Sequence, residues 1–269
     1  MTELKKNQMY RYLLVLTICA TAGLYVWRSL FDNFVVNEIG LNGSHVGILQ
    51  SVREIPGFLA LLVVYVLLII KEHRLSALSV LILGAGVAAT GFLPSFYGIL
   101  VTTLIMSFGF HYFETTNQSL TLQYFDNKTS PLVFGKLRSF ASASNICAGI
   151  IIFVLAPILN YLQLYLLFGG LIVVASLWAL SQDPCDKNLI PQRKKMILKK
   201  RYWLFYFLTF MAGARRQIFV AFAVFLLVKK FHFSVQEIAA LFIVNNVINF
   251  FLSPFIGKCI VIFGERKVL

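Results

Sequence analysis

The first group able to do chemistry is a pair of opposite charges inside an apolar stretch near the start of the chain. Arg28 and Asp32 are four residues apart, and Tyr25 lies on the same side of the stretch. Residues with this spacing are neighbours on one face of a helix. A guanidinium binds a carboxylate or phosphate through two parallel hydrogen bonds. The pattern indicates an anion-binding position, or a pair that only neutralises itself near a membrane interface.

A second polar face belongs to a later apolar stretch. It consists of His111, Glu114 and Gln118, spaced i, i+3 and i+7. Histidine titrates near neutral pH, and intramembrane His and carboxylate groups form the usual proton relays. We therefore expect Asp32, His111 and Glu114 to carry proton coupling. The alternative for His111 and Glu114 is a polar tether between helices.

Two adjacent arginines, Arg215 and Arg216, lie near the middle of a third apolar stretch. An arginine in hydrocarbon costs about 2.5–3.5 kcal/mol on insertion scales, so it normally faces a cavity or a partner. Neighbouring residues on a helix point about 100° apart, so only one of the two can face a cavity squarely. The side chains expected to contact a substrate are Tyr25, Arg28, Gln118, Arg215 and Arg216.

Other polar groups favour structural roles. Arg53 and Glu54 are expected near the outer end of an apolar stretch, where an ion pair between helices is favoured. Asn145 and Asn246 represent two amide-bearing faces, which more often join helices than bind ligands.

The elements that position these groups must be membrane-spanning helices. Hydrophobic residues make up 59% of the chain and charged residues 13%, whereas a soluble domain carries about 25% charge. A span needs about 20 predominantly apolar residues. Eight stretches satisfy this, namely 12–35, 45–70, 76–93, 96–116, 135–157, 161–180, 202–228 and 235–263. The sequence thus predicts an all-α polytopic membrane protein.

The distribution of basic residues predicts the orientation. Lys and Arg gather before the first stretch and in the even-numbered loops, and above all between residues 187 and 201. By the positive-inside rule, the N-terminus and these loops are cytoplasmic. This topology accounts for the net charge of +13 without a nucleic-acid partner. The basic linker is expected to contact anionic membrane lipid.

The chain repeats itself after 190 residues. Arg11-Tyr12 then falls on Arg201-Tyr202, and Ser44 falls on Ser234. Six apolar stretches separate one start from the next, and a repeated six-helix unit is typical of secondary transporters. The expected domains are an N-terminal six-helix bundle (1–181), a basic cytoplasmic linker (182–201) and the start of a second bundle (202–269).

Six spans, a basic linker and a second set that begins the same way resemble the major facilitator superfamily. Its loop motif after the eighth span is similar to Gly257-Lys258 followed by Gly264-Glu265-Arg266-Lys267. After the second span only Lys71 and Arg74 of a motif remain, without its glycine and aspartate. The resemblance implies a gating role for Lys71, Arg74, Gly257, Gly264, Glu265 and Arg266. It also implies that the first, fourth and seventh helices line the central cavity.

The resemblance implies twelve spans, so eight suggest a C-terminally truncated sequence, with a true eight-helix protein as the rival. We expect a six-helix N-terminal bundle plus the first two helices of a second bundle. The expected function is proton-coupled transport of a small organic anion or zwitterion across the plasma membrane, as a monomer. The alternatives are a multidrug or amphipathic-solute efflux permease and a non-transporting receptor or scaffold.

Enzymatic and ATP-driven functions are not favoured. The chain contains no G-x-x-x-x-G-K-[ST], H-E-x-x-H or G-x-S-x-G motif. Its four histidines are scattered along the sequence, so neither a metal site nor any other cofactor is expected.

The orientation can be tested at Cys185, which lies in the most basic loop. A membrane-impermeant thiol reagent should label it in inside-out vesicles and not in intact cells, with Cys185→Ser as the control. Labelling of Cys185 in intact cells would reverse the predicted topology.

Overall fold

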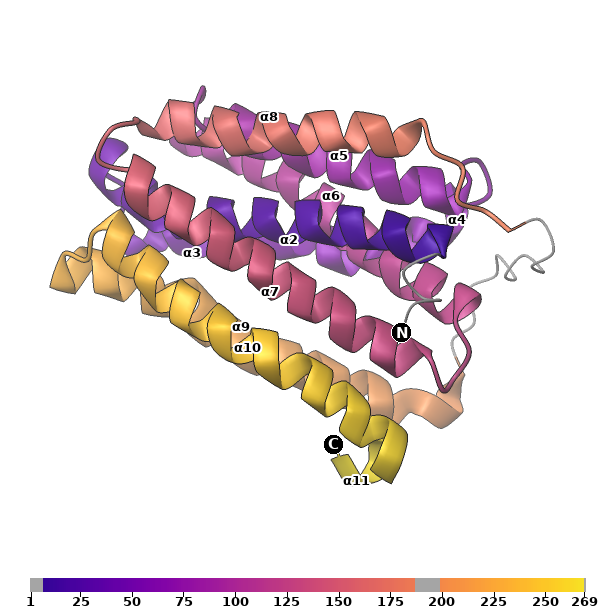
Figure 1. Cartoon of the computed structure of the whole chain (residues 1–269). Coiled ribbons are helices and arrows are strands. Elements are labelled where there is room, and N and C mark those ends of the chain that lie inside the picture. Colours follow the sequence, from indigo (N-terminus) through magenta and orange to yellow (C-terminus); the bar gives the residue numbers. More distant parts are fainter. Residues whose placement is uncertain (1–6, 187–198, 269) are drawn as a thin grey trace.

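The computed structural model describes residues 7–186 and 199–268, without the side chains of residues 212–221, 265 and 266. All elements of these residues are helices (Figure 1). In chain order they are α2 (Gln8–Asn33), η1 (Phe34–Glu38), α3 (Gly43–Leu59), η2 (Ala60–Leu62), α4 (Val63–Val66), α5 (Glu72–Thr90), α6 (Phe96–Tyr124), α7 (Ser130–Leu155), α8 (Tyr161–Leu180), η3 (Lys200–Tyr202), α9 (Trp203–Phe231), α10 (Val235–Phe263) and α11 (Glu265–Val268).

The long helices coincide with the eight expected spans. Within the described residues, seven are long and apolar enough to cross a membrane. The remaining expected span is α9, which has 29 residues but includes side chains outside the described set. Several helices extend beyond the expected bounds: α2, α5 and α7 begin four or five residues earlier, at Gln8, Glu72 and Ser130, and α6 continues to Tyr124 rather than residue 116. Hydropathy marks the apolar core of a helix, whereas backbone hydrogen bonding carries the helix beyond that core.

Capping residues fix where the second helix of each repeat begins. The Asn42 side chain accepts the backbone N–H of His45 at the start of α3, and the His45 ring faces the Asn42 backbone N–H in return. Ser234 and Glu237 form the same reciprocal arrangement at the start of α10. Such capping boxes satisfy backbone donors that a helix start leaves unpaired. A shift of 190 residues would place the Asn42 cap at residue 232, so the Ser234 cap lies two residues later than the repeat predicts.

The first six spans form a bundle with α2 near its centre. Helix α2 contacts α5, α6, α7 and α8, and its buried residues include Leu13, Leu16, Trp27 and Leu30. Helices α5 and α8 lie together on one side of the bundle (Figure 1). The first span, the helix that carries Arg28 and Asp32, therefore packs against four helices of the bundle and also contacts α9 and α10.

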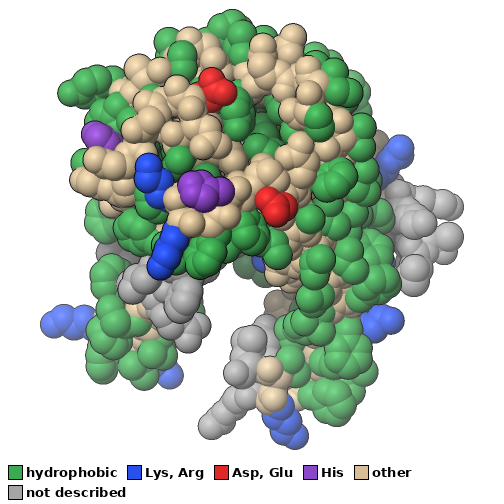
Figure 2. All heavy atoms as spheres, turned by 90° about the vertical axis from the view of Figure 1, so that its left-hand side faces the viewer, with side chains coloured by type: hydrophobic (Ala, Val, Ile, Leu, Met, Phe, Trp, Pro, Cys, Tyr) green, Lys and Arg blue, Asp and Glu red, His purple; other side chains and the backbone are tan. Residues whose placement is uncertain are grey.

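Helices α9 and α10 lie on the opposite side of the bundle from α8 (Figure 1). Helix α10 packs along α7, and α9 contacts α3. Figure 2 views the molecule from the end where α9 ends and α10 begins, and the surface is hollowed between the two lower columns of side chains. Both helices expose large hydrophobic side chains, such as Leu226 and Phe251, as a helix surrounded by apolar partners or lipid does.

Glycines allow the bundle helices to approach closely. A Cβ atom on Gly169 of α8 would lie 2.5 Å from the backbone nitrogen of Ala88 on α5. A Cβ atom on Gly86 of α5 would meet the backbone of Met106 on α6 in the same way. Because backbone atoms cannot rotate aside, a larger residue at either position must push two helices apart.

Two neighbouring glycines of α8 provide a matched test of this packing. Gly169→Ala should destabilise the purified protein by about 1–3 kcal/mol, because the new methyl group meets the α5 backbone. Gly170→Ala is the control, since a Cβ atom there meets nothing within 4 Å. Thermal unfolding in detergent should show a lower midpoint for Gly169→Ala alone. Equal midpoints for both variants would contradict the close approach.

Candidate functional site

The centre of the candidate site is the buried carboxylate of Asp32 on α2. The residue is only 5% exposed. Arg28 on the same helix and Arg53 on α3 both interact with it electrostatically. The fully buried Tyr165 of α8 also interacts electrostatically with Asp32. Two arginines from two helices thus interact with one acid, whose Oδ1 atom accepts no hydrogen bond from the described residues. The interaction of Arg28 with Asp32 is part of a larger cluster.

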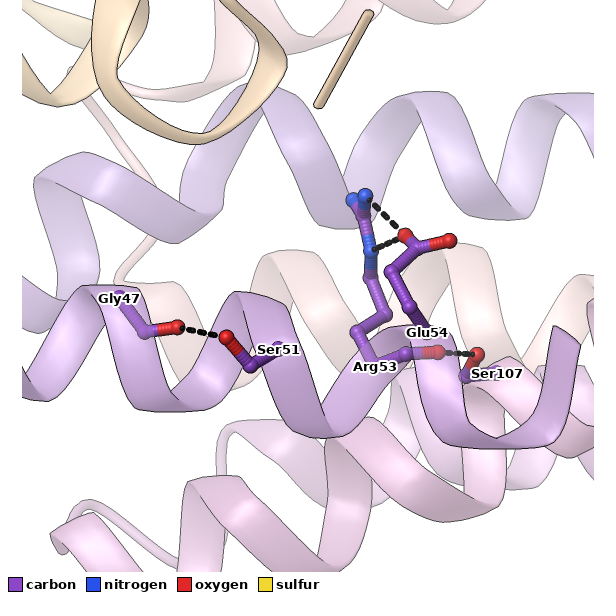
Figure 3. A network of polar contacts seen from close by, with 5 residues as sticks. All are labelled: Gly47, Ser51, Arg53, Glu54 and Ser107. Atoms are coloured by element: carbon purple, nitrogen blue, oxygen red, sulfur yellow. Dashed lines mark hydrogen bonds and ion pairs between the residues drawn. The ribbon is translucent and has the colours of Figure 1, made fainter. Parts of the chain in front are cut away.

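Arg53 carries the cluster into α3 (Figure 3). Its Nη2 and Nε atoms donate to Oε1 of Glu54 at 2.7 and 3.1 Å. This ion pair lies within one helix, and the interaction of Arg53 between helices is with Asp32 of α2. Arg53 also lies close to the middle of the span Gly43–Val66 rather than near its outer end. It is 8% exposed, and its guanidinium lies 5.9 Å from the centre of the Trp27 ring.

The backbone around Arg53 is held by the neighbouring helix. Ser107 of α6 donates to the Arg53 carbonyl, while the Arg53 side chain extends from the helix toward Glu54 (Figure 3). One turn earlier, Ser51 donates to the Gly47 carbonyl at 2.9 Å within α3. The α3–α6 contact therefore fixes the direction in which the Arg53 side chain leaves the helix.

Aromatic contacts join the α2 part of the site to α10. The guanidinium of Arg28 lies 5.2 Å from the ring centre of Phe242, which is within the range of a cation–π interaction. The ring of Tyr25 lies 5.9 Å from that of Phe242. Gly149 of α7 makes room for the Tyr25 hydroxyl, which a Cβ atom there would overlap. Tyr25 and Arg28 thus contact the second repeat through Phe242.

His111 of the second polar face, on α6, packs against α3 one turn beyond Arg53. The imidazole of His111 packs over Gly57, where an added Cβ atom would lie 2.9 Å from the ring. Gly57 follows Arg53 by four residues, so the two positions share one face of α3. Glu114 and Gln118 are exposed on α6. Helix α3 therefore connects the Asp32 cluster with the face that carries His111.

Amides between α7 and α10 act as helix–helix contacts. The Asn145 side chain donates to Oδ1 of Asn246 at 3.0 Å, and Asn246 donates to the Phe242 carbonyl at 2.8 Å. Ser139 donates to the Phe250 carbonyl at 2.9 Å. These bonds match the structural role expected for the two amide-bearing faces, and they hold Phe242 beside Arg28.

The residues expected in gating loops occupy different surroundings. Lys71 and Arg74 are exposed around the start of α5. Gly257 lies inside α10, where a Cβ atom would meet the Pro131 carbonyl of α7 at 3.0 Å. Gly264 ends α10 with a φ of 82°, a backbone conformation that suits glycine. The side chains of Arg215, Arg216, Glu265 and Arg266 lie outside the described residues.

A family comparison identifies the architecture. The sequence model of the Major Facilitator Superfamily matches residues 13–269. No functionally curated protein is similar enough in sequence to be matched.

Solved structures agree with this match. The chain is similar to the nucleoside transporter NupG, with 17% identity and a TM-score of 0.69 over 97% of this chain and 69% of that one for its D323A mutant. For NupG without that mutation, the identity is 16% and the TM-score is 0.67, and the match covers 96% of this chain and 69% of that one. The chain is also similar to a bacterial homolog of the human lysosomal transporter Spinster, solved in an inward-facing and unoccupied conformation. The sequence identity is 13% and the TM-score is 0.59, and the match covers 96% of this chain and 62% of that one.

The charge cluster predicts a specific pattern of thermal stability. Arg53→Met should destabilise the protein, because Asp32 and Glu54 lose a shared cation and a buried unpaired charge is costly. Adding Asp32→Asn should restore part of the loss, with a coupling energy of about 0.5–3 kcal/mol. Thermal unfolding of the two single variants, the double variant and a Ser51→Ala control measures this coupling. Additive effects of the two substitutions would show that Arg53 and Asp32 do not interact.

Proposed function

Since the chain belongs to the Major Facilitator Superfamily, we propose that it moves a small organic solute through a central site by proton-coupled alternating access. Members of this family are membrane transporters, and the chain is accordingly a multi-pass membrane transporter and not an enzyme. The observation that carries the finer proposal is the buried acid Asp32 between Arg28 and Arg53. Charged groups are kept inside a membrane protein mainly where they bind, pair or relay protons.

The substrate proposed is an organic anion or a zwitterion. Arg28 and one of Arg215 and Arg216 provide guanidinium groups from the first and second repeats. A guanidinium holds a carboxylate or phosphate with two hydrogen bonds, and it stays charged at any physiological pH. Tyr25 and Gln118 complete the set of proposed substrate contacts. A solute that bridges the two repeats favours closure around it, as alternating access requires.

The acids of the site favour a zwitterion over a simple anion. Asp32 and Glu54 offset the charges of Arg28 and Arg53, so this part of the site has no net charge. The anionic end of a zwitterion can replace an acid beside an arginine, and its cationic end can replace an arginine beside an acid. The rings of Tyr25 and Phe242 also provide an aromatic surface, so nucleosides, named for the similar structure NupG, belong in the first set of solutes tested.

Proton coupling is assigned to Asp32, His111 and Glu114. Histidine changes charge in the physiological range, and Glu114 is exposed on the same helix one turn away. The α3 face between Arg53 and Gly57 offers a short physical connection from this pair to Asp32. Protonation of one acid then changes the partners available to the arginines, which links the proton to the solute.

The remaining proposals concern the whole chain. The first bundle comprises residues 1–181 and rocks against the bundle that begins at residue 202, with 182–201 as a cytoplasmic linker that contacts lipid. Lys71, Arg74, Gly257, Gly264, Glu265 and Arg266 are proposed to control closure at the cytoplasmic side. The protein is proposed to work as a monomer in the plasma membrane.

Transport in proteoliposomes tests the coupling. Labelled organic anions, zwitterions and nucleosides are offered with and without an imposed pH gradient, and the gradient should drive accumulation of at least one of them. Glu114→Gln should lower that accumulation to the level without a gradient, while exchange of solute across the membrane persists.

Thr115→Ala is the matched control, because Thr115 is the exposed neighbour of Glu114 and its hydroxyl donates to the His111 carbonyl within α6. It should keep the pH-driven accumulation. Unchanged pH dependence in Glu114→Gln would assign Glu114 a structural role and remove it from the proton relay.

A further inference from the structure

A second cluster of potential ligands lies far from the central site, where α2 and α5 begin and α8 has ended. Beyond Leu180 the chain turns back against the start of α5. Cys185 Sγ lies 3.0 Å from Nδ1 of His73, and Asp183 Oδ1 lies 3.8 Å from its Nε2. One ligand atom from each of the three residues lies within 4.8 Å of the others. The fold thus brings together a thiol, an imidazole and a carboxylate that are far apart in the sequence.

The imidazole of His73 is built into the bundle with unused binding capacity. The residue is 2% exposed, and Nε2 has no hydrogen-bond partner among the described residues. Tyr12 of α2 donates its hydroxyl to the His73 carbonyl at 2.7 Å. The ring edge of Tyr12 also contacts the imidazole, with ring centres 6.4 Å apart. A buried polar nitrogen normally finds a partner, so this one points to a ligand.

We propose that His73, Asp183 and Cys185 bind a divalent transition metal ion, with Zn²⁺ as the best fit. Thiolate, imidazole and carboxylate are the three ligand types that Zn²⁺ takes from proteins. Hard ions such as Mg²⁺ and Ca²⁺ require oxygen ligands and do not suit a thiolate. Three protein ligands leave one position for water.

The spacing fits such an ion after small side-chain movements. Tetrahedral Zn²⁺ with bonds of about 2.0–2.3 Å holds its ligand atoms about 3.3–3.8 Å apart. Cys185 Sγ faces Nδ1 of His73 at 3.0 Å, whereas Asp183 Oδ1 faces Nε2 at 3.8 Å. Because the imidazole binds an ion through one nitrogen, one of these two side chains must shift toward the nitrogen that the other faces. With one ligand atom taken from each residue, the three atoms already lie within 4.8 Å of one another. Asp183 and Cys185 are exposed in a segment without regular structure, so their side chains can adjust to the fixed His73.

An ion can reach the cluster from solvent. An open cavity of about 260 Å³ lies beside it, lined by Tyr12, Asp183, Arg11 and neighbouring residues of α2 and α8. Binding would fasten the segment that follows α8 to the start of α5. The ion would therefore fix the point from which the linker leaves the first bundle, independently of which solute the central site accepts.

Metal titration of the purified full chain, freed of metal and of any histidine tag, tests the site. Isothermal titration should show one Zn²⁺ bound per chain. Each of His73→Gln, Asp183→Asn and Cys185→Ser should weaken binding at least tenfold. Co²⁺ should bind in the same place and produce the near-ultraviolet absorption band of a cobalt–thiolate bond, which Cys185→Ser should abolish.

Two controls keep the outcome decisive. Cys147→Ser removes an exposed cysteine of α7 and should leave Zn²⁺ affinity and the Co²⁺ band unchanged. Asp183→Asn changes an exposed side chain, so its thermal midpoint without metal should equal that of the unchanged chain. Zn²⁺ binding that survives both His73→Gln and Cys185→Ser, or a Co²⁺ complex without the thiolate band, would overturn the proposal.

Discussion

A charge inside a membrane protein must have a partner, and this constraint organises the first bundle. Asp32 is buried at the centre, where its charge interacts with Arg28 from its own helix and with Arg53 from α3. Arg53 in turn is shared with Glu54 and packed over Trp27. Moving α2 relative to α3 would separate these charges in a medium that screens them poorly. The interaction of Arg53 with Asp32 therefore opposes relative movement of the two helices.

The sequence predicts the helices well because a membrane imposes a simple rule. A span must be apolar and long, so all eight stretches appear as helices in Figure 1. Helix ends follow local hydrogen bonding instead, and for this reason α5 begins earlier and α6 ends later than hydropathy indicates. Sequence spacing also predicts one-helix relations, such as Arg28 with Asp32.

Relations between helices were harder to predict. The sequence pattern places Arg53 near the membrane edge, because it does not show which side chain of α2 lies close to Arg53 in the fold. His73 was read as one of four scattered histidines, although the fold places it against a cysteine 112 residues away. The one usable signal in the sequence is the position of His73 at the start of a predominantly apolar helix, where a side chain can be buried. Only the return of the chain beyond α8 reveals what that histidine faces.

The two clusters lie on parts of the molecule that move differently under the two-bundle proposal. Phe242 of α10 touches Arg28 and Tyr25, so the central cluster contacts the second repeat and must change when the bundles rock. The groups around His73 come from α2 and α5 of the first bundle and from the first residues of the linker, directly after α8. A metal ion there would stiffen that bundle without crossing the boundary between the repeats. Helix α2 contributes Tyr12, which contacts His73 near the proposed metal site, and also Arg28, which belongs to the proposed substrate site. At about 1.5 Å per residue the two positions are about 24 Å apart. That separation lets the site near His73 hold the linker in place while the charges around Asp32 exchange partners.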